Sequence, residues 1–474
     1  MTVRQYDAVV VGAGPNGLAA AITLARAGRA VLVMEGRETA GGGMRSSALT
    51  LPGFVHDICS AVHPLALASP FFRSLGLLDY GLEWVHSPVA LAHPFDDGTA
   101  VLLERSPDRT AAALGPDAAS YRALMKPLVS HWEQLVEDLL APVHIPRHPV
   151  ALLHFGGLAI GSIERLASRR FNGARARALF GGIAAHAVLP ADRPLGSAIG
   201  LLLGAAGHAV GWPLPRGGSQ RIADAMVRCL IRIGGEVRTG VEVQSMEQLP
   251  GARAVLFDVM PGALARIARD RLPDDYRRRL LAHRHGPGVF KMDWALDAPI
   301  PWRAQECLRA ATVHVGGTYE EMREAEDRVW QGGHSEKPLV LLSQPTLFDP
   351  SRAPQGKHTA WAYCHVPNGS THDMSDRIET QIERFAPGFR DRILARSTMN
   401  ALDMEAHDPN FVGGDIAGGI QDVLWRTLRP LGRWQPYSTP ARGIYVCSSS
   451  QPPGAGVHGM CGFHAARKAL REVF

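Results

Sequence analysis

The sequence predicts an α/β fold, and three observations within the first forty of its 474 residues predict it. An apolar run at 7–11 has the length of a buried strand and leads into a glycine-rich turn. An alanine-rich run at 18–28 has the composition of a helix, and a second apolar run at 30–34 ends on Glu35. Strand, glycine turn, helix, strand and acid follow one another in the order of a Rossmann-type dinucleotide-binding unit.

The turn between the first strand and the helix reads Gly12-Ala13-Gly14-Pro15-Asn16-Gly17. Gly12 permits the tight turn, Gly14 lets the backbone approach a pyrophosphate, and Gly17 lets the helix pack near the sheet. The N-terminus of the helix then offers unpaired N–H groups and a partial positive charge to the phosphates. Glu35 lies 18 residues beyond Gly17, where its carboxylate can accept hydrogen bonds from ribose hydroxyls.

Composition and charge indicate a globular protein without a nucleic-acid partner. Hydrophobic residues make up 46% of the chain, its net charge is +5, and it has no dense basic cluster. The six cysteines form no Cys-x-x-Cys pair, so neither a redox dithiol nor a metal site is expected. The N-terminus enters the first strand without a signal peptide, so we expect a cytoplasmic protein with reduced thiols.

One stretch, from Pro194 to Pro215, contains no Asp, Glu, Lys or Arg over its 22 residues, which is long enough in principle to span a bilayer. Several glycines and His208 interrupt it. The sequence therefore favours a buried helix and turn that line an apolar pocket. Peripheral contact with a membrane surface is the alternative interpretation.

A second glycine loop follows Glu35 and reads Gly41-Gly42-Gly43-Met44-Arg45-Ser46. A glycine loop shortly after the ribose acid is what an FAD site adds to the plain dinucleotide unit, because the longer cofactor is wrapped from a second side. Arg45 can pair with phosphate, and Ser46 can donate a hydrogen bond. A surface loop with a solvated arginine is the alternative.

The rest of the chain divides into regions of different character. Residues 66–211 are predicted to be mainly helical and to face the substrate or a membrane, whereas residues 262–430 alternate strand-like and helix-like runs, as in a mixed α+β substrate domain. A Pro-Gly-Gly loop, a helix and two strand-like runs at 212–261 return the chain to the nucleotide-binding sheet. We therefore expect a discontinuous cofactor domain made of residues 1–65, 212–261 and 431–474.

The C-terminal region holds another glycine turn. A strand-like run at 443–448 precedes the sequence Pro453-Gly454-Ala455-Gly456-Val457-His458-Gly459-Met460, and a helix is predicted from about residue 461 to 473. The N-terminus of a helix at this place can stabilise negative charge on a reduced flavin ring. A simple helix cap is an equally good reading of this stretch alone.

Taken together, these motifs resemble the phytoene desaturase branch of FAD-dependent oxidoreductases, which includes carotenoid isomerases and retinol saturases and is related to flavin amine oxidases. The two glycine loops, Glu35, the loop Pro215-Arg216-Gly217-Gly218-Ser219 and the C-terminal turn occur in the family's order. Within the branch, the chain looks most like a poorly characterised group named for a pyridine nucleotide-disulphide oxidoreductase domain. The resemblance implies a GR2-like FAD-binding domain with an interleaved α+β substrate domain.

The resemblance also implies how FAD is held. The glycines of the first turn approach the pyrophosphate, Glu35 holds the adenosine ribose, and the backbone of Val243 meets adenine. The C-terminal turn lies beside the isoalloxazine ring. With the loop residues argued above, the candidate cofactor residues are Gly12, Gly14, Pro15, Asn16, Gly17, Glu35, Gly42, Gly43, Arg45, Ser46, Val243, Gly456, Val457, His458, Gly459 and Met460.

Two positions depart from the family's pattern. The second glycine loop often reads Gly-Gly-Arg, and here that arginine position is Gly43, so either Arg45 or the backbone alone has to hold the phosphate. The carotenoid enzymes tend to have proline where this chain has His458, and a titratable group near the flavin changes the chemistry. These departures bear on the substrate more than on the cofactor.

The function expected from this resemblance is desaturation of a hydrophobic substrate, such as a polyene, an isoprenoid or a lipid, by hydride transfer to flavin N5. The glycine cluster at 413–419 lacks a strand–helix frame, so we expect no second nucleotide site and an external electron acceptor such as oxygen or a quinone. The alternatives are a redox-neutral isomerase or a saturase of a polyene, an amine or amino-acid oxidase, and a flavoprotein with only a binding role.

The sequence alone names no catalytic residue. Four histidines are conceivable, and three aromatic residues are candidates for the aromatic cage that an amine oxidase would use. These residues are His186, His314, His365, His458, Trp294, Trp361 and Tyr363.

Overall fold

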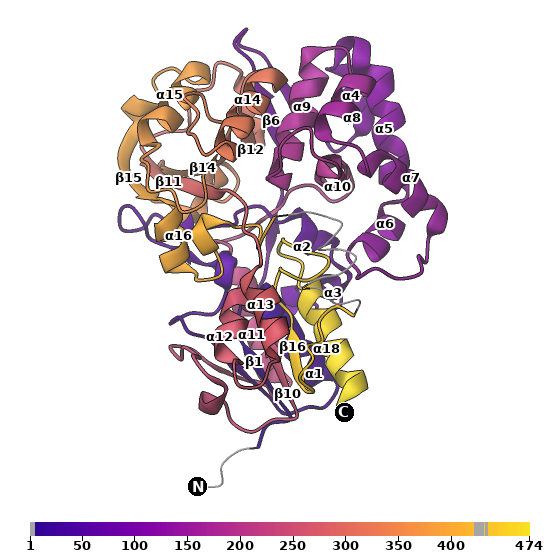
Figure 1. The fold of residues 1–474 in the computed structure, drawn as a ribbon. Coiled ribbons are helices and arrows are strands. Elements are labelled where there is room, and N and C mark those ends of the chain that lie inside the picture. The colour runs from indigo at the N-terminus through magenta and orange to yellow at the C-terminus, as the bar shows by residue number, and fades with distance from the viewer. Residues whose placement is uncertain (1–4, 421–430, 432–434) are drawn as a thin grey trace.

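A computed structural model of the protein describes residues 5–420, 431 and 435–474. The chain forms two parts that meet around a central cavity (Figure 1). One part, lower in the view, is built on a parallel sheet and contains both described ends of the chain. The other part combines a mixed sheet with a group of helices.

The parallel sheet has five strands in the order β16-β10-β1-β2-β9. Four of the strands consist mainly of aliphatic residues, which suits a parallel sheet covered on both faces. The sheet draws its strands from the first, middle and last parts of the chain. The strands are β1 (Ala8–Val11), β2 (Val31–Met34), β9 (Glu236–Arg238), β10 (Ala254–Phe257) and β16 (Ile444–Val446).

Two layers of helices cover this sheet. Helices α1 (Pro15–Arg26), α11 (Gln220–Arg232) and α18 (Met460–Glu472) pack against one face. Helices α12 (Pro261–Ile267) and α13 (Asp274–Leu281) cover the other face. The predicted α/β fold with a Rossmann-like sheet is confirmed. Of the two strand-like runs expected at 212–261, the first covers residues 236–243 in the sequence but forms a shorter strand. Strand β9 ends at Arg238, and the chain turns at Gly240, whose φ is +69°.

The second sheet has seven strands in the order β15-β11-β14-β13-β12-β6-β7. Its neighbours are antiparallel except for the parallel pair β6 and β12. Helix α15 (Ser375–Phe385) packs on its apolar face. The strands are β6 (Val89–Pro94), β7 (Ala100–Leu103), β11 (Gly288–Leu296), β12 (Ala310–Val315), β13 (Val340–Ser343), β14 (His358–Val366) and β15 (Ile393–Met399).

Strands β6 and β7 come from the region 66–211, which the sequence predicts to be mainly helical. Both strands are short buried apolar runs, and such runs do not distinguish strand from helix by periodicity. From α4 onward, the helices of that region form a bundle beside the sheet (Figure 1). They are α4 (Pro107–Ala112), α5 (Ala118–Ser130), α6 (Trp132–Leu139), α7 (Pro149–Ala159), α8 (Ile163–Arg170), α9 (Ala174–Ala184) and α10 (Gly196–Ala209).

Short elements join the two parts. Strand β3 (Ser46–Ser47) pairs with β4 (His56–Asp57), and β5 (Trp84–Val85) pairs with β8 (Leu214–Pro215). Helices α2 (Pro64–Ala68) and α3 (Pro70–Arg73) follow β4 in the chain. Helices α14 (Tyr319–Trp330) and α16 (Ala401–His407) contact strands of the seven-stranded sheet.

Helix α10 corresponds to the uncharged stretch at 194–215, and it confirms the prediction of a buried helix at this place. Its glycines allow close packing, since a Cβ atom on Gly207 would lie 2.4 Å from Leu103 Cδ2 and one on Gly200 would lie 2.8 Å from Ala184 Cβ. Within the described ranges, no single helix is both long and apolar enough to cross a membrane. Helices α7 and α8 together pass that test, but the pair is bent by 95°.

Candidate functional site

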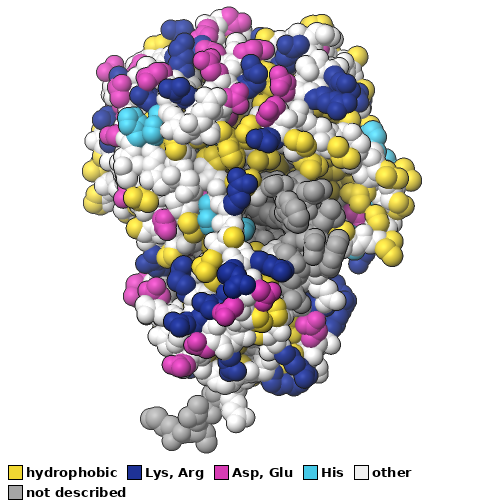
Figure 2. Space-filling model, viewed as in Figure 1, with side chains coloured by type: hydrophobic (Ala, Val, Ile, Leu, Met, Phe, Trp, Pro, Cys, Tyr) yellow, Lys and Arg dark blue, Asp and Glu magenta, His cyan; other side chains and the backbone are white. Residues whose placement is uncertain are grey.

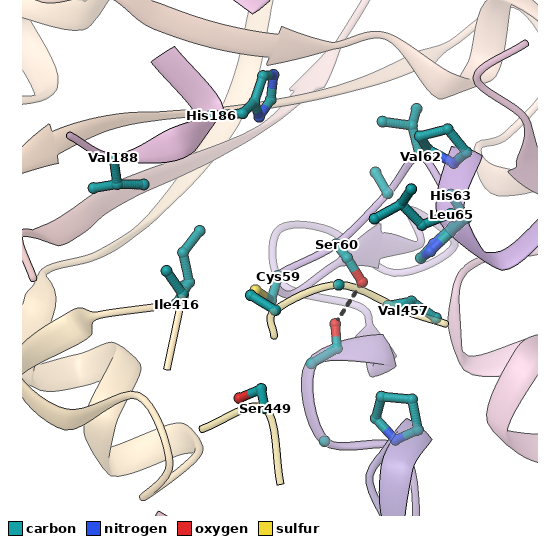
Figure 3. Close-up of a pocket in the computed structure, with 18 of the residues that line it drawn as sticks. Cys59, Ser60, Val62, His63, Leu65, His186, Val188, Ile416, Ser449 and Val457 are labelled. Atoms are coloured by element: carbon teal, nitrogen blue, oxygen red, sulfur yellow. Dashed lines mark hydrogen bonds between the residues drawn. The ribbon is translucent and has the colours of Figure 1, made fainter. Parts of the chain in front are cut away.

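The candidate site is a cavity of about 370 Å³ between the two sheets (Figure 3). At one end it is lined by the glycine turns of the cofactor domain, and at the other end by the seven-stranded sheet and helix α10. The lining residues of the first end are Gly14, Pro15, Asn16, Gly42, Gly43, Asp258, Pro453, Gly456 and Val457. Segments that lie more than four hundred residues apart in the sequence therefore share one wall.

Two helix N-termini meet at the cofactor end. A Cβ atom on Gly462, in the first turn of α18, would lie 1.8 Å from the backbone oxygen of Asn16, in the first turn of α1. Only glycine permits this approach, so the two helix starts lie side by side. Their free N–H groups and their dipoles favour a negatively charged ligand at this end of the cavity.

The two glycine loops form a cradle that side chains would fill. A Cβ atom on Gly14 would lie 2.7 Å from Asp258 Oδ2, and one on Gly42 would lie 3.2 Å from Gly14 Cα. A Cβ atom on Gly43 would lie 3.3 Å from the ring of Phe411. This narrow backbone-lined space fits the pyrophosphate of a dinucleotide, which explains why glycine occupies these positions.

Glu35 connects the two loops. Its Oε2 atom accepts a hydrogen bond from the Ala13 N–H at 2.7 Å, and its Oε1 atom accepts one from Arg37 N–H at 2.9 Å. Arg45 Nη2 lies 3.1 Å from the same Oε1, and the arginine side chain is only 6% exposed. Arg45 is therefore not a solvated surface arginine. Its Nη1 atom has no hydrogen-bond partner within the described residues, and Arg45 is not a residue that lines the cavity, so its contact with phosphate stays a prediction.

Ser46 has a different role from the predicted cofactor contact. Its hydroxyl donates to Asp57 Oδ1 at 2.7 Å and accepts from the Gln220 N–H at 3.0 Å. The hydroxyl is therefore used both as a donor and as an acceptor within the protein. Asp57 also accepts from the Ser219 N–H and forms a buried ion pair with Arg352. Burial alone would raise the pKa of Asp57, but the Arg352 guanidinium and the Ser219 N–H hold it below its usual value.

The Pro-Gly-Gly loop belongs to this same network. The Gly217 N–H donates to Asp349 at 2.6 Å, and Asp349 in turn binds Arg352 at 3.1 Å. Arg352 Nη2 donates to the Pro215 oxygen at 2.9 Å. A Cβ atom on Gly218 would lie 2.6 Å from Ser46 Oγ. The loop therefore joins the cofactor domain to the substrate sheet through buried charges.

His458 does not face the cavity as a titratable group, contrary to the expectation from the sequence. Its Nδ1 atom accepts the Met460 N–H at 3.0 Å, and its Nε2 atom donates to the Gly454 oxygen at 3.1 Å. Burial lowers the pKa of His458 to about 4, so the imidazole is neutral. The side chain caps α18, whose N-cap residue is Gly459, and shapes the turn at Gly456 and Val457.

Val243 lies near Glu35 but outside the cavity. The Val241 N–H donates to the Glu35 oxygen at 2.8 Å, and Val243 is buried against the core under the parallel sheet. A Cβ atom on Gly36 would lie 3.5 Å from Glu242 Cα, so the two segments are in contact. The contact of Val243 with adenine stays a prediction.

Asp258 is a site residue that the sequence analysis missed. It follows strand β10, lines the cavity and accepts the Gly17 N–H on Oδ2 at 2.8 Å. Burial raises the pKa of Asp258 to about 7, against the effect of the Gly17 N–H, and the carboxylates of Asp408 and Glu35 add to the rise. The signal was present in the sequence, since ligands bind at the carboxyl ends of parallel strands.

The substrate end is mostly apolar but contains two histidines. The Ser219 hydroxyl donates to the Ser60 oxygen at 2.6 Å, so the nitrogen of His63 that lies 2.8 Å from Ser219 Oγ carries the proton. His186 Nε2 lies 3.2 Å from His314 Nε2. Burial lowers the pKa of His63 and of His186 to about 4, so both line the cavity as neutral imidazoles.

Of the remaining candidate residues, some line the cavity and others do not. Trp361 and Tyr363 line the cavity with their ring centroids 5.5 Å apart. Trp294 lies on the opposite face of the sheet, where it donates to Glu379 at 3.1 Å. His365 pairs with Glu326 at 2.8 Å and is fully enclosed. The three aromatic candidates therefore do not form one cage.

Comparison with known proteins agrees with this architecture. A model of the NAD(P)-binding Rossmann-like domain matches residues 10–75. The hydroxyneurosporene desaturase of Cereibacter sphaeroides is 30% identical, with 98% of this chain and 97% of that protein covered. Mouse pyridine nucleotide-disulfide oxidoreductase domain-containing protein 2 is 25% identical, with 99% and 94% covered.

The fold and the paired glycine loops define a flavin-type dinucleotide-binding oxidoreductase. More specifically, the chain belongs to the phytoene desaturase family of these oxidoreductases. Among solved structures, putrescine oxidase with bound putrescine has a TM-score of 0.61 at 18% identity, and 99% of each chain is covered. That similarity shows the shared fold of the flavin amine oxidases.

Proposed function

We propose that the protein binds FAD and desaturates a hydrophobic substrate, such as a polyene, an isoprenoid or another lipid. The observation that carries this proposal is the single cavity that joins the phosphate cradle to a largely apolar chamber. When bound, FAD supplies the hydride acceptor N5, and the substrate loses a hydride and a proton as its double bond forms. The remaining steps depend on the residues of this chain.

The glycine loops and the starts of α1 and α18 hold the pyrophosphate, and Arg45 Nη1 adds a charged donor. Glu35 binds the ribose while it keeps the loops together. Apolar side chains from α10 exclude water from the chamber and orient the substrate by contact. These side chains are Ile199, Leu202 and Leu203. In Figure 3, the further apolar residues Val188 and Ile416 lie across the cavity from Cys59.

Charge distribution favours a neutral substrate over an amine. Among the described residues, no Lys, Arg or Glu lines the cavity, and the two aspartates that do, Asp258 and Asp408, lie at the glycine loops. A buried ammonium group would need a carboxylate partner or an aromatic cage. Trp361 and Tyr363 line the cavity as a pair, whereas Trp294 lies on the opposite face of the sheet, so the three do not form a cage. The amine oxidase alternative is therefore less well supported than the desaturase.

The electron acceptor is external. The glycine cluster at 413–419 forms a tight turn rather than a second nucleotide unit, and a Cβ atom on Gly288 of β11 would lie 2.4 Å from the Gly413 oxygen. Oxygen or a quinone is the acceptor that we propose. A redox-neutral isomerase or a saturase would use the same cavity, but it would consume no acceptor during turnover.

Purification and anaerobic titration test this proposal. We expect a yellow protein whose flavin absorbance bleaches when an isoprenoid polyene is added without oxygen, and which is unaffected by primary amines. The colour should return on addition of oxygen or a quinone. A colourless protein, or bleaching by amines alone, would overturn the proposal. Conversion of the polyene to an isomer without bleaching would identify the redox-neutral alternative.

We further propose that the helical bundle contacts an anionic membrane surface, from which a lipid-like substrate would enter. Half of the large exposed hydrophobic residues of the described chain fall within residues 143–160. On α7, Val150 and Leu153 lie on one side with helical spacing, opposite the buried residues Ala151 and Phe155, and Ile160 directly follows the helix. The exposed residues are Val143, Ile145, Val150, Leu153 and Ile160, with exposures of 62 to 91%.

Charge around these exposed residues suits an anionic surface. Helix α7 contains no Asp, Glu, Lys or Arg, and α8 ends on the exposed residues Arg169 and Arg170. Figure 2 shows hydrophobic side chains gathered at the right-hand edge of the molecule, where Figure 1 places α6 and α7. Helix α10 packs against α7 and lines the cavity, so a single helix separates this surface from the chamber.

Vesicle sedimentation tests this contact. We expect the protein to sediment with phosphatidylcholine vesicles that contain phosphatidylglycerol, and less with phosphatidylcholine alone. Leu153→Glu with Ile160→Glu should abolish sedimentation, whereas the control Ile231→Glu, at an exposed hydrophobic residue of α11, should leave it intact. Equal sedimentation of all three proteins, or self-association through the exposed residues at 143–160 without vesicle binding, would contradict the proposal.

A further inference from the structure

The seven-stranded sheet turns a polar face toward the cavity. Alternate residues of its central strands lie on the opposite, apolar face and pack under α15; examples are Val313, Leu342 and Ala362. Most of the residues between them, apart from aliphatic ones such as Leu341, are polar or aromatic, and all of these except the half-buried Tyr363 are almost fully buried. They are Lys291, Asp293, Thr312, His314, Ser343, Trp361, Tyr363 and His365.

Three of these residues form a continuous row across neighbouring strands. Thr312 of β12 pairs with Ser343 of β13, and Ser343 pairs with Trp361 of β14. Cross-strand partners project from the same face of a sheet, with Cβ atoms about 4.5–5.5 Å apart. All three residues line the cavity, so the row forms part of its wall.

The polar atoms of this row are unsatisfied. Thr312 Oγ1, Ser343 Oγ and Trp361 Nε1 are shielded from solvent and have no hydrogen-bond partner within the described part of the chain. Each buried polar group without a partner destabilises a fold by about 1–3 kcal/mol. Three such groups side by side on the wall of a cavity indicate that a ligand supplies the missing hydrogen bonds.

The chemistry of the row defines the ligand group. Two hydroxyls can donate or accept, whereas the indole N–H can only donate, so together they suit an oxygen atom that accepts. The row itself carries no charge. The nearby residues Lys291 and Asp293 form a buried ion pair, and neither residue lines the cavity. The Lys291 ammonium lies beside the row, with Nζ 5.8 Å from the centroid of the Trp361 ring. A carboxylate or an ammonium group would remain unpaired here, but a hydroxyl, carbonyl or ether oxygen would not.

We propose that the row Thr312–Ser343–Trp361 binds a neutral oxygen function on an otherwise hydrophobic substrate, so that the substrate is an oxygenated isoprenoid rather than a pure hydrocarbon. This inference rests on the proposed function, because it concerns the substrate of the same cavity. It assigns the row to substrate specificity. The flavin-reducing chemistry at the other end of the cavity does not depend on it.

Binding of two matched probes tests the inference on the protein as purified. The probes are geranylgeraniol and its hydrocarbon analogue that ends in a methyl group, and their affinities are read from quenching of tryptophan fluorescence, because Trp212 and Trp361 line the cavity. We expect the alcohol to bind about tenfold more tightly, as one or two buried hydrogen bonds allow. Ser343→Ala and Thr312→Val should reduce this preference to less than about threefold, because the alcohol loses a hydrogen bond that the hydrocarbon never makes.

The exposed serine of α8 provides the control, since Ser168→Ala should keep the full preference for the alcohol. Equal affinity of the wild-type protein for the two probes, or an unchanged preference in both row variants, overturns the inference but leaves the desaturase proposal intact. Binding of neither probe overturns the inference together with the proposal of an isoprenoid substrate. Flavin bleaching by a polyene, measured separately, tells these two failures apart.

Discussion

The two sheets of this protein bury opposite kinds of surface. The parallel sheet is apolar on both faces: Val10 and Val33 pack into one core, and Val9 and Val11 pack into the other. The seven-stranded sheet buries an apolar face under α15 and a polar face at the cavity. Both sheets border the same cavity, yet they contribute to it in different ways.

The parallel sheet presents mainly backbone to the cavity. Its contributions are glycine turns, helix N-termini and close approaches, such as the one between Gly462 and Asn16. The seven-stranded sheet contributes side chains, from Thr312 to Trp361, that belong to three different strands. A backbone surface of this kind leaves a local signature in the sequence, whereas a group of side chains from several strands does not. The following predictions challenge this distinction, from the largest expected effect to the smallest.

Gly14→Val should abolish cofactor binding, by more than about a hundredfold, because the new side chain fills the cradle next to Asp258 Oδ2. The measurement is the ratio of flavin to protein absorbance after purification. Gly251→Ala is the control, since a Cβ atom there meets nothing within 4 Å. Retained flavin in the valine variant would show that backbone approach at this turn is not what holds the cofactor.

Arg352→Met should destabilise the protein by about 3–5 kcal/mol, because it leaves the buried carboxylates of Asp57 and Asp349 without their shared partner. Chemical denaturation measures the loss. The exposed pair Arg269–Asp270 offers a matched control, and Arg269→Met should change the free energy of unfolding by less than about 1 kcal/mol. Similar effects in the two variants would mean that the contact between the two sheets does not depend on this network.

The raised pKa of Asp258 predicts that cofactor affinity depends on pH. With its pKa raised to about 7 by burial, the carboxyl is neutral at pH 6 and ionised at pH 8, where it repels the pyrophosphate. If binding raises this pKa by about one unit, the affinity for FAD should fall by about fivefold over this range. Equilibrium titration with FAD at several pH values measures it, and Asp258→Asn should give a flat profile. A flat profile in the wild-type protein would contradict the prediction.

The same group affects stability with a defined sign. Because its pKa in the folded protein exceeds the ordinary value of 3.8, Asp258 binds its proton more tightly when folded. Its contribution to stability is therefore fully present below about pH 4 and is lost as the pH rises toward about 7. Asp258→Asn should remove this contribution to the pH dependence of denaturation.

Ser343→Ala should change the free energy of unfolding least, by between zero and about 1 kcal/mol in the stabilising direction, since it removes a buried hydroxyl without a described partner. Thermal denaturation of the ligand-free protein measures it. A loss of stability would show that the hydroxyl has a structural partner, and the row would then resemble an ordinary core.

Prediction from the sequence located the cavity correctly where one short segment contains the whole motif, whereas the binding role of that segment stays a prediction. The turn at Gly12–Gly17 and the second loop at Gly42 and Gly43 lie at the cavity, as their local patterns indicate. Prediction was less successful where a polar side chain could bind either the cofactor or another group of the protein. Ser46 was predicted to contact the cofactor but binds Asp57, and His458 caps α18, because buried polar groups take the nearest backbone or carboxylate partner.

The sequence by itself determined the order of strand, glycine turn, helix and acid, and hence the cofactor half of the protein, because glycines and apolar runs act on the backbone next to them. Only the tertiary structure decided which residues meet at the substrate end. Thr312, Ser343 and Trp361 become neighbours through strand register, and Asp258 reaches Gly17 across 241 residues of sequence. No local pattern encodes such contacts, since they arise when distant segments pack together.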